Sequence, residues 1–281
     1  MESSVETLHQ TRAEAFRQLH DRPGIFVVPN PWDAGSAKIL AGLGFEALAT
    51  TSAGLAFALG KPDGEGAITR EETLENVRAI LAATPLPVTA DLENGYGDDP
   101  SACAETILLA AGTGLSGGSI EDATGRPGDP IYPFEVAVER IKGAVAATKS
   151  LSVPFILTAR AENLIYGRPD LADTLRRLEA FADAGADVLF APGLKTREEI
   201  DTAVRAVAPR PLHVIAGLNN MSLSLDELAA LGVKRVSLGS SLARAAYGAF
   251  LQAAEEIRGK GRFTLASGAV PYARLNALFR S

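Results

Sequence analysis

Short apolar runs alternate with longer amphipathic segments along most of the chain. The apolar runs are 25–29, 47–51, 87–93, 117–122, 154–160, 187–192, 212–217 and 235–239. Between them, stretches such as 70–83, 171–186 and 224–232 carry apolar residues at helical spacing. Short apolar strands that alternate with amphipathic helices predict βαβ units and a parallel sheet. Eight such units favour an α/β fold of the closed (β/α)8, TIM-type barrel class over an open sheet.

The chain contains no Pro/Ser-rich linker and no shift in composition, so we expect one barrel domain over 1–281. Residues 1–20 predict a leading helix before the first strand. Residues 262–281 follow the eighth unit and predict an extra helical segment, apolar enough to dock on its own barrel or on a neighbouring subunit. A free tail of this kind would expose an apolar patch that soluble monomers usually avoid.

Composition excludes several classes of protein. The 281 residues carry 27 Lys and Arg against 34 Asp and Glu, a net charge of −7, which argues against a nucleic-acid partner. A single cysteine, Cys103, rules out an intramolecular disulfide, and three histidines are too few for a typical histidine metal site. No apolar run reaches the ~18 residues of a membrane span, and the polar N-terminus does not resemble a signal peptide. We therefore expect a cytoplasmic protein without a membrane partner.

Acidic residues and one arginine fall at consecutive strand ends or in the loops that follow them. They are Asp63, Asp91, Glu93, Glu121, Asp122 and Arg160. In a barrel, the carboxyl-terminal strand ends carry the active site. Asp91 and Glu93 are two residues apart in DLENGYG, so they share one face. These side chains are therefore predicted to converge on one rim.

Clustered carboxylates repel one another and favour protonation, and a divalent cation removes that repulsion. Mg²⁺ favours oxygen-rich sites with few direct carboxylates and several waters. The pattern thus predicts a Mg²⁺ site, with Mn²⁺ as the second possibility. The alternative for each acid taken alone is an ordinary solvated loop residue.

Other candidates leave two interpretations open. The turn 52–55 could present amides to an oxyanion, or could be a tight βα turn. Trp32 could wall a pocket or lie in the core. Residues 239–241 follow the eighth strand, where barrels often bind phosphate, although helix capping explains them as well. His213 and Cys103 are expected in the core.

Six motifs in order, PWDAGSA, TTSAG, KPDGEG, DLENGYG, SIED and LTAR, give the chain a family resemblance. Over nearly its whole length it resembles the isocitrate lyase/phosphoenolpyruvate mutase superfamily. Members of that superfamily are (β/α)8 barrels whose last helix swaps between subunits, commonly in a tetramer of two swapped dimers. The resemblance therefore implies a homotetramer in which the C-terminal segment contacts a neighbour.

The superfamily's chemistry passes through an enolate of a small carboxylic acid, with Mg²⁺ on the keto-acid oxygens. The resemblance implies that Asp91 binds the metal directly and that Asp63, Glu93 and Glu121 hold metal-bound waters. The implied substrate-binding residues are Trp32, Ser52, Gly54, Leu55, Arg160 and Asn219, and the implied catalytic residues are Asp63, Glu121, Arg126 and Arg160.

The chain departs from the family pattern in the loop after the fourth strand. Lyases of the superfamily carry a catalytic cysteine there, and mutases carry a lysine. Here DATGRPGDPIYP (122–133) contains no Cys, Lys or His, and Arg126 is its only cation. After the sixth strand, Phe-Pro-Glu is replaced by Phe190-Ala191-Pro192. Both departures argue against isocitrate or methylisocitrate cleavage and against the mutase reaction.

The sequence thus predicts a Mg²⁺-dependent lyase. Its substrate would be a small α-keto acid or a 2-hydroxy di- or tricarboxylate, cleaved or decarboxylated through an enolate. The alternatives are a ligand-binding member without catalysis, an enzyme of P–C bonds, or a barrel isomerase with phosphate at 239–241.

Overall fold

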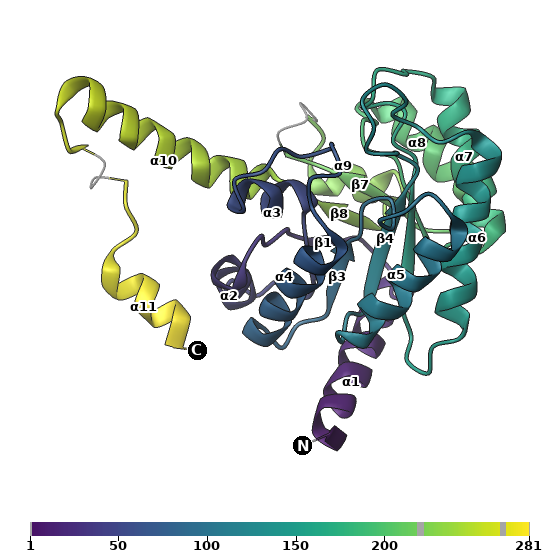
Figure 1. The fold of residues 1–281 in the computed structure, drawn as a ribbon, viewed down its shortest axis with the longest axis horizontal. Helices are drawn as coiled ribbons and strands as arrows, with labels where there is room; N and C mark the ends of the chain where they lie inside the picture. The colour runs from purple at the N-terminus through teal and green to yellow at the C-terminus, as the bar shows by residue number, and fades with distance from the viewer. Residues whose placement is uncertain (1, 218–221, 265–267, 281) are drawn as a thin grey trace.

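Eight parallel strands lie in the order β1-β8-β7-β6-β5-β4-β3-β2 and curl into a nearly closed barrel with helices outside it (Figure 1). This computed structural model describes residues 2–217, 222–264 and 268–280. The strands are β1 (Phe26–Val28), β2 (Leu48–Ala49), β3 (Val88–Asp91), β4 (Gly117–Glu121), β5 (Ile156–Arg160), β6 (Val188–Phe190), β7 (Leu212–Ile215) and β8 (Arg235–Ser237). The predicted (β/α)8 class is confirmed.

Helices separate the strands, and local sequence signals explain where many of them begin. They are α1 (Glu2–Asp21), α2 (Ala34–Gly42), α3 (Ser52–Ala58), α4 (Arg70–Ala83), α5 (Pro100–Gly112), α6 (Phe134–Lys149), α7 (Leu171–Ala184), α8 (Arg197–Val207), α9 (Leu225–Ala230), α10 (Ser241–Lys260) and α11 (Tyr272–Arg280). Helices α4, α8 and α9 start with a capping box, in which a Ser or Thr and a Glu three residues later satisfy each other's free amides.

The barrel has a seam between β1 and β2, which form no ladder with each other. Their one backbone hydrogen bond runs from Ala49 N to Pro29 O, at 3.1 Å. The side chain of Asn30 supplements it: Nδ2 donates to Thr50 O at 3.0 Å, and Oδ1 accepts from Leu238 N at 2.8 Å. A single buried amide therefore ties the chain after β1 to the ends of β2 and β8.

Helix α1 closes the amino-terminal end of the barrel. Phe16 and Leu19 are buried there against residues that begin strands, including Phe26 and Val188. Burying such side chains is worth about 1.5–3 kcal/mol each. We call this end, where the strands start, the floor of the barrel. The predicted leading helix thus covers the floor, opposite the rim that carries the acids.

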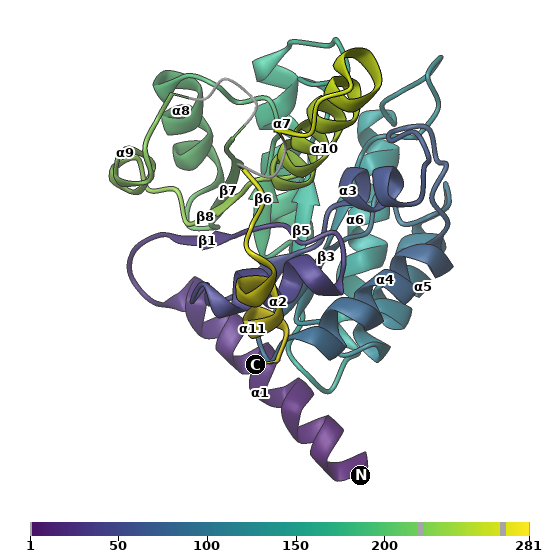
Figure 2. The same ribbon diagram turned by 90° about the vertical axis from the view of Figure 1, so that its left-hand side faces the viewer.

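The C-terminal helices leave the barrel and come back to it. Helix α10 projects away from the strands (Figure 1), with Ala243 its buried residue and Phe250 70% exposed. Helix α11 then lies beside α2 of the same chain (Figure 2). Lys38 Nζ on α2 donates to Phe279 O at 3.0 Å. Helix α11 therefore docks on its own barrel here. In the described part of the chain, no helix has the length and apolar character needed to cross a bilayer.

Candidate active site

Arg160, the last residue of β5, lies among the carboxylates at the rim. Its Nη1 is 2.8 Å from Asp91 Oδ1 and 3.1 Å from Glu121 Oε2. Its Nη2 is 2.9 Å from Glu162 Oε1. The register explains the meeting, because Arg160 pairs with Glu121 on β4, and β4 pairs with β3 up to Asp91. One guanidinium thus joins acids from three successive strand ends.

Asp91 is the most strongly held acid. Its Oδ2 accepts from Ser52 Oγ at 2.9 Å and from Ser52 N at 3.3 Å, and its Oδ1 accepts from Glu93 N at 3.2 Å. Burial alone would raise the pKa of Asp91, but Arg160 and the bonds from Ser52 hold that pKa below its ordinary value. Asp91 is therefore an ionised carboxylate with a fixed orientation, which suits a direct metal ligand.

Burial and neighbouring carboxylates raise the pKa values of the other acids, which favours their protonated forms while no cation is bound. Burial, Asp91 and Asp63 raise the pKa of Glu93 to about 8. Burial and Asp91 also raise the pKa of Asp63, and burial raises the pKa of Glu121 well above its usual range despite Arg160. We call Asp63, Asp91, Glu93, Glu121 and Glu162 the carboxylate cluster. These five acids surround one cation, Arg160.

Glu162 belongs to this cluster and was missed in the sequence analysis. Its side chain is 2% exposed and also accepts from Arg160 Nε at 3.0 Å. Burial is the main cause that raises the pKa of Glu162 to about 7. The signal was present, because Glu162 lies two residues beyond Arg160, the same spacing that singled out Asp91 and Glu93.

Two residues near the rim point elsewhere. Asp122, next to Glu121, faces the outer layer, where its Oδ2 lies 2.9 Å from Arg177 Nη1. Strand alternation explains this, since neighbours face opposite sides. Arg126 lies 2.8 Å from Asp98 and over the ring of Tyr132. In this arrangement Arg126 pairs with Asp98 rather than with the carboxylate cluster, and its catalytic role stays a prediction.

The turn after β2 brings Ser52 to the site but not the other expected residues. Gly54 N donates to Thr51 Oγ1 at 3.2 Å as part of the cap of α3, and Leu55 is buried. A Cβ on Gly54 would lie 2.9 Å from Trp32 Cβ, so Trp32 packs behind this turn. The amide of Gly54 is thus used by the helix cap rather than by the cavity. Asn219 lies outside the described residues.

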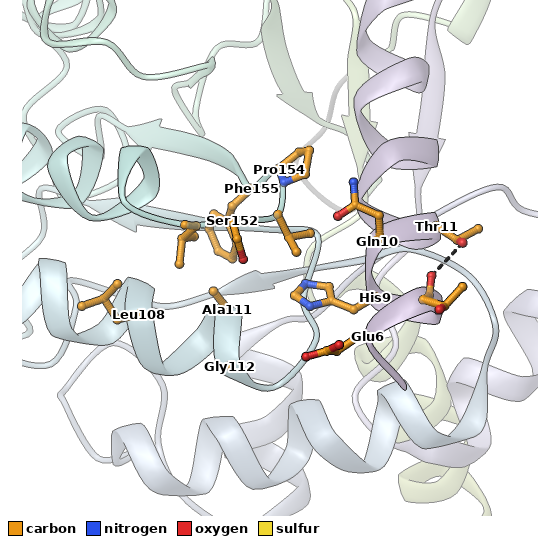
Figure 3. Close-up of a pocket in the computed structure, with 13 residues that line it drawn as sticks. Glu6, His9, Gln10, Thr11, Leu108, Ala111, Gly112, Ser152, Pro154 and Phe155 are labelled. Carbon is orange, nitrogen blue, oxygen red and sulfur yellow. Dashed lines mark hydrogen bonds between the residues drawn. The ribbon is translucent and has the colours of Figure 1, made fainter. Parts of the chain in front are cut away.

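The rim opens into a cavity of about 330 Å³ that is lined by Ser52, Asp63, Asp91 and Arg160 and continues down inside the barrel. A smaller space of about 110 Å³ adjoins it between Glu93, Glu121 and Glu162. A larger hollow of about 770 Å³ lies by the floor between α1, α5 and the segment before β5 (Figure 3). Its lining includes His9, whose ring is within 3.1 Å of Leu115 O, and it holds no comparable cluster of acids.

The carboxylate cluster fits a hard divalent cation. Its donors are all oxygens, and burial together with neighbouring carboxylates raises the pKa values of Glu93 and Glu121, an effect that a bound cation would offset. Within the described ranges, no three His, Cys, Asp or Glu side chains are close enough to hold an ion directly. An ion there would therefore bind few carboxylates and several waters, the usual manner of Mg²⁺.

Residues 16–258 match the family described as phosphoenolpyruvate phosphomutase. The chain belongs to this family. The match covers the strands and the rim just described, and it confirms the resemblance to the isocitrate lyase/phosphoenolpyruvate mutase superfamily, whose members are lyases and mutases.

Three relatives illustrate the family. A crystal structure provisionally described as a lyase/mutase from Burkholderia cenocepacia J2315 is 57% identical, with a TM-score of 0.94 and 98% of each chain covered. Oxaloacetate decarboxylase from Pseudomonas putida is 31% identical over 87% of this chain and 83% of its own. The structure of oxaloacetate acetylhydrolase with the product oxalate is 29% identical, with a TM-score of 0.85 and 95% and 93% of the two chains covered.

Proposed function

We propose that the protein is a Mg²⁺-dependent lyase that breaks a C–C bond in a small α-keto acid or 2-hydroxy di- or tricarboxylate, through an enolate. The observation that carries this proposal is the carboxylate cluster around Arg160 at the mouth of the cavity inside the barrel. Relatives named oxaloacetate decarboxylase and oxaloacetate acetylhydrolase support a substrate of this kind. Mn²⁺ would serve in place of Mg²⁺.

Asp91 would hold the metal directly, and Asp63, Glu93 and Glu121 would hold it through water. When bound, the metal would supply Lewis-acid stabilisation of negative charge on the reacting oxygen. The chain's own residues would orient the metal ligand and bind the substrate. Ser52 fixes the Asp91 carboxylate by two hydrogen bonds. Arg160, fixed in turn by Glu162, donates to a carboxylate of the substrate and holds it at the mouth of the barrel.

Two loops narrow the entrance and reduce its exposure to water. The loop after β4 is closed by an antiparallel bridge between Ala123 and Ile131. A Cβ on Gly125 would lie 3.4 Å from Gly66 N, so this loop touches the loop that carries Asp63. Exclusion of water strengthens every electrostatic interaction inside a site.

The P–C bond reaction is the second candidate, supported by the description of the matching family. The loop after β4 offers no Lys for it, and Arg126 is paired with Asp98. A binding function without catalysis would use the same cluster. We therefore rank C–C cleavage first.

Turnover of purified protein tests the proposal. Oxaloacetate, 2-hydroxy diacids and phosphonopyruvate would each be assayed with Mg²⁺, with Mn²⁺ and with EDTA. We expect metal-dependent turnover of at least one carboxylic acid, and its loss in Asp91→Ala but not in Asp99→Ala, an exposed acid eight residues away. Turnover of phosphonopyruvate alone would favour the P–C reaction, and binding without any turnover would overturn the catalytic proposal.

A further inference from the structure

Arg235, the first residue of β8, is a buried cation at the floor of the barrel, 2% exposed. Its Nη2 donates to Thr158 Oγ1 at 2.6 Å and lies 2.9 Å from His213 Nδ1. Its Nε is buried without a hydrogen-bond partner. Across the described ranges, no carboxylate lies within ion-pair distance of its guanidinium.

The neighbours of Arg235 are neutral. Burial and Arg235 lower the pKa of His213 well below its ordinary value, so the ring carries no charge at neutral pH. Its Nδ1 then accepts from Arg235, and its Nε2 donates to Ser237 Oγ at 2.8 Å. Burial lowers the pKa of Arg235 to about 9, which still leaves it protonated at neutral pH. A buried charge without a counter-charge costs several kcal/mol.

The cavity that opens at the rim reaches this cation. Its lining includes both Arg160 at the rim and Arg235 at the floor. The two are linked through β5, because Thr158, which bonds to Arg235, lies two residues before Arg160 on the same face. Thr158 and Arg160 are separated by two residues of strand, a rise of roughly 7 Å, so the contact of Arg235 with Thr158 places Arg235 deeper in the barrel than Arg160.

The walls between the two arginines suit a polar ligand. Thr89, Ser119 and Ser237 line the cavity, together with the ring of Phe190 and the side chain of Ile215. Phe190 stacks on His213 with ring centroids 4.1 Å apart, and Arg160 lies over Phe190 at 5.3 Å. The cavity wall therefore combines hydroxyl groups with apolar side chains, and it contains Arg160, paired with acids, at the rim and Arg235, without a paired acid, at the floor.

We propose that Arg235 binds a carboxylate at the floor of the cavity. The protein would then bind dicarboxylic acids more tightly than monocarboxylic acids that share the same 2-hydroxy or 2-keto acid group. This inference rests on the proposed function for the first carboxylate, which Arg160 holds at the rim. A separate small anion at the same position would also neutralise the charge of Arg235.

Calorimetry of the full-length protein with Mg²⁺ tests this inference without requiring turnover. L-malate and L-lactate share a 2-hydroxy acid head, and malate adds the second carboxylate. A hydrogen-bonded charge pair is worth about 1.5–3 kcal/mol, so we expect malate to bind roughly 10- to 100-fold more tightly than lactate. Arg235→Gln keeps a donor for Thr158 but removes the charge, and should abolish the difference.

Two further variants keep the test decisive. Arg12→Gln is a matched control, since Arg12 is also buried and donates to backbone carbonyls, including Leu81 O at 3.1 Å, far from the cavity. It should keep the preference for malate. Arg235→Lys retains the charge and should keep part of the preference, so the test stands even if Arg235→Gln fails to fold.

Sodium formate distinguishes the two sources of the anion. If formate raises the affinity for lactate in the wild type but not in Arg235→Gln, a free anion can take the Arg235 position, which supports the anion site. Equal affinities for malate and lactate in the wild type, or a preference for malate that persists in Arg235→Gln, would overturn this inference but not the proposed function. Failure of both acids to bind with Mg²⁺ would instead count against the proposed function.

Discussion

Arg160 and Asp91 form a 2.8 Å ion pair across the barrel mouth, although a whole strand, β4, lies between their own strands. Both side chains are largely buried, with 13% and 15% of their surfaces exposed. The pair fixes the guanidinium that we propose to bind substrate to the acid that we expect to hold the metal. Substitution of either residue should therefore change the position of the other side chain.

Asp91→Ala should abolish Mg²⁺ binding, because it removes the one carboxylate expected to bind the ion directly. Glu93→Gln should weaken binding less, since a water lies between Glu93 and the ion in our proposal. Titration calorimetry with MgCl₂ measures both, with Asp99→Ala as the control. Equal Mg²⁺ affinity in the wild type and Asp91→Ala would exclude the metal assignment.

Glu162→Gln should lower kcat/KM by about 10- to 100-fold while the fold is kept, as for other residues that orient a functional group. The amide keeps the shape of the side chain but loses the charge that holds Arg160 Nε and Nη2. Steady-state kinetics and far-UV circular dichroism report the two effects. Glu135→Gln, on the exposed face of α6, is the control. Unchanged kinetics would show that Arg160 does not depend on Glu162.

Cys103→Ser should change activity by no more than about threefold. Cys103 is fully buried, burial raises the pKa of its thiol, and its Sγ lies 3.7 Å from Asn94 O, outside the carboxylate cluster. A stability loss of about 1 kcal/mol is expected from the poorer packing of a hydroxyl. Kinetics and urea unfolding provide the measurements. A collapse of turnover with intact folding would mean that Cys103 takes part in the reaction.

The free energy of unfolding should decrease as the pH falls, because His20 is buried in its neutral form. Burial and the nearby charge of Arg235 lower the pKa of His20 to about 3, against 6.5 in an unfolded chain. The unfolded state therefore binds the extra proton, and stability is lost as the pH falls from about 6.5 towards 3. At pH 5 the loss is about 2 kcal/mol relative to pH 8. Urea unfolding of the wild type and His20→Gln checks this, and parallel pH profiles would contradict it.

The protein should be an oligomer in which the C-terminal helices take part. Helix α10 projects away from the barrel, and its apolar side chains Phe250 and Leu251 are 70% and 58% exposed to solvent. Light scattering on the full chain should give more than one subunit. Deleting residues 262–281 should lower the mass and the melting temperature. A full-length monomer at micromolar concentration would refute the prediction.

The carboxylate cluster could be largely predicted because strand ends obey simple rules. A parallel barrel brings successive carboxyl ends together, so Asp91, Glu121 and Arg160 had to meet once eight units were recognised. The expectation that Asp122 converges with them was wrong, because neighbours on a strand face opposite ways and Asp122 pairs with Arg177 in the outer layer. Local periodicity also sufficed for helices such as α4, predicted over 70–83 and found there.

What could not be predicted depends on contacts between distant segments. Arg126 looked available as the only cation of its loop, but Asp98, 28 residues earlier, pairs with it. Gly54 looked like an amide donor, but Thr51 uses that amide as a helix cap. The charge state of Arg235 and its neighbours depends on burial at the floor, which no local pattern in β8 reveals.

The seam between β1 and β2 places the least secured part of the hydrogen-bonded ring directly beside the reaction centre. Ser52 follows β2 within three residues, so the segment that orients Asp91 is anchored on one side by a two-pair ladder with β3. On the other side it is anchored by the Ala49–Pro29 hydrogen bond and by Asn30. Local opening should start where cross-strand bonds are fewest. The amide of Ala49 should thus exchange its hydrogen before those of β4 and β5, which would let the mouth widen without unfolding the ring.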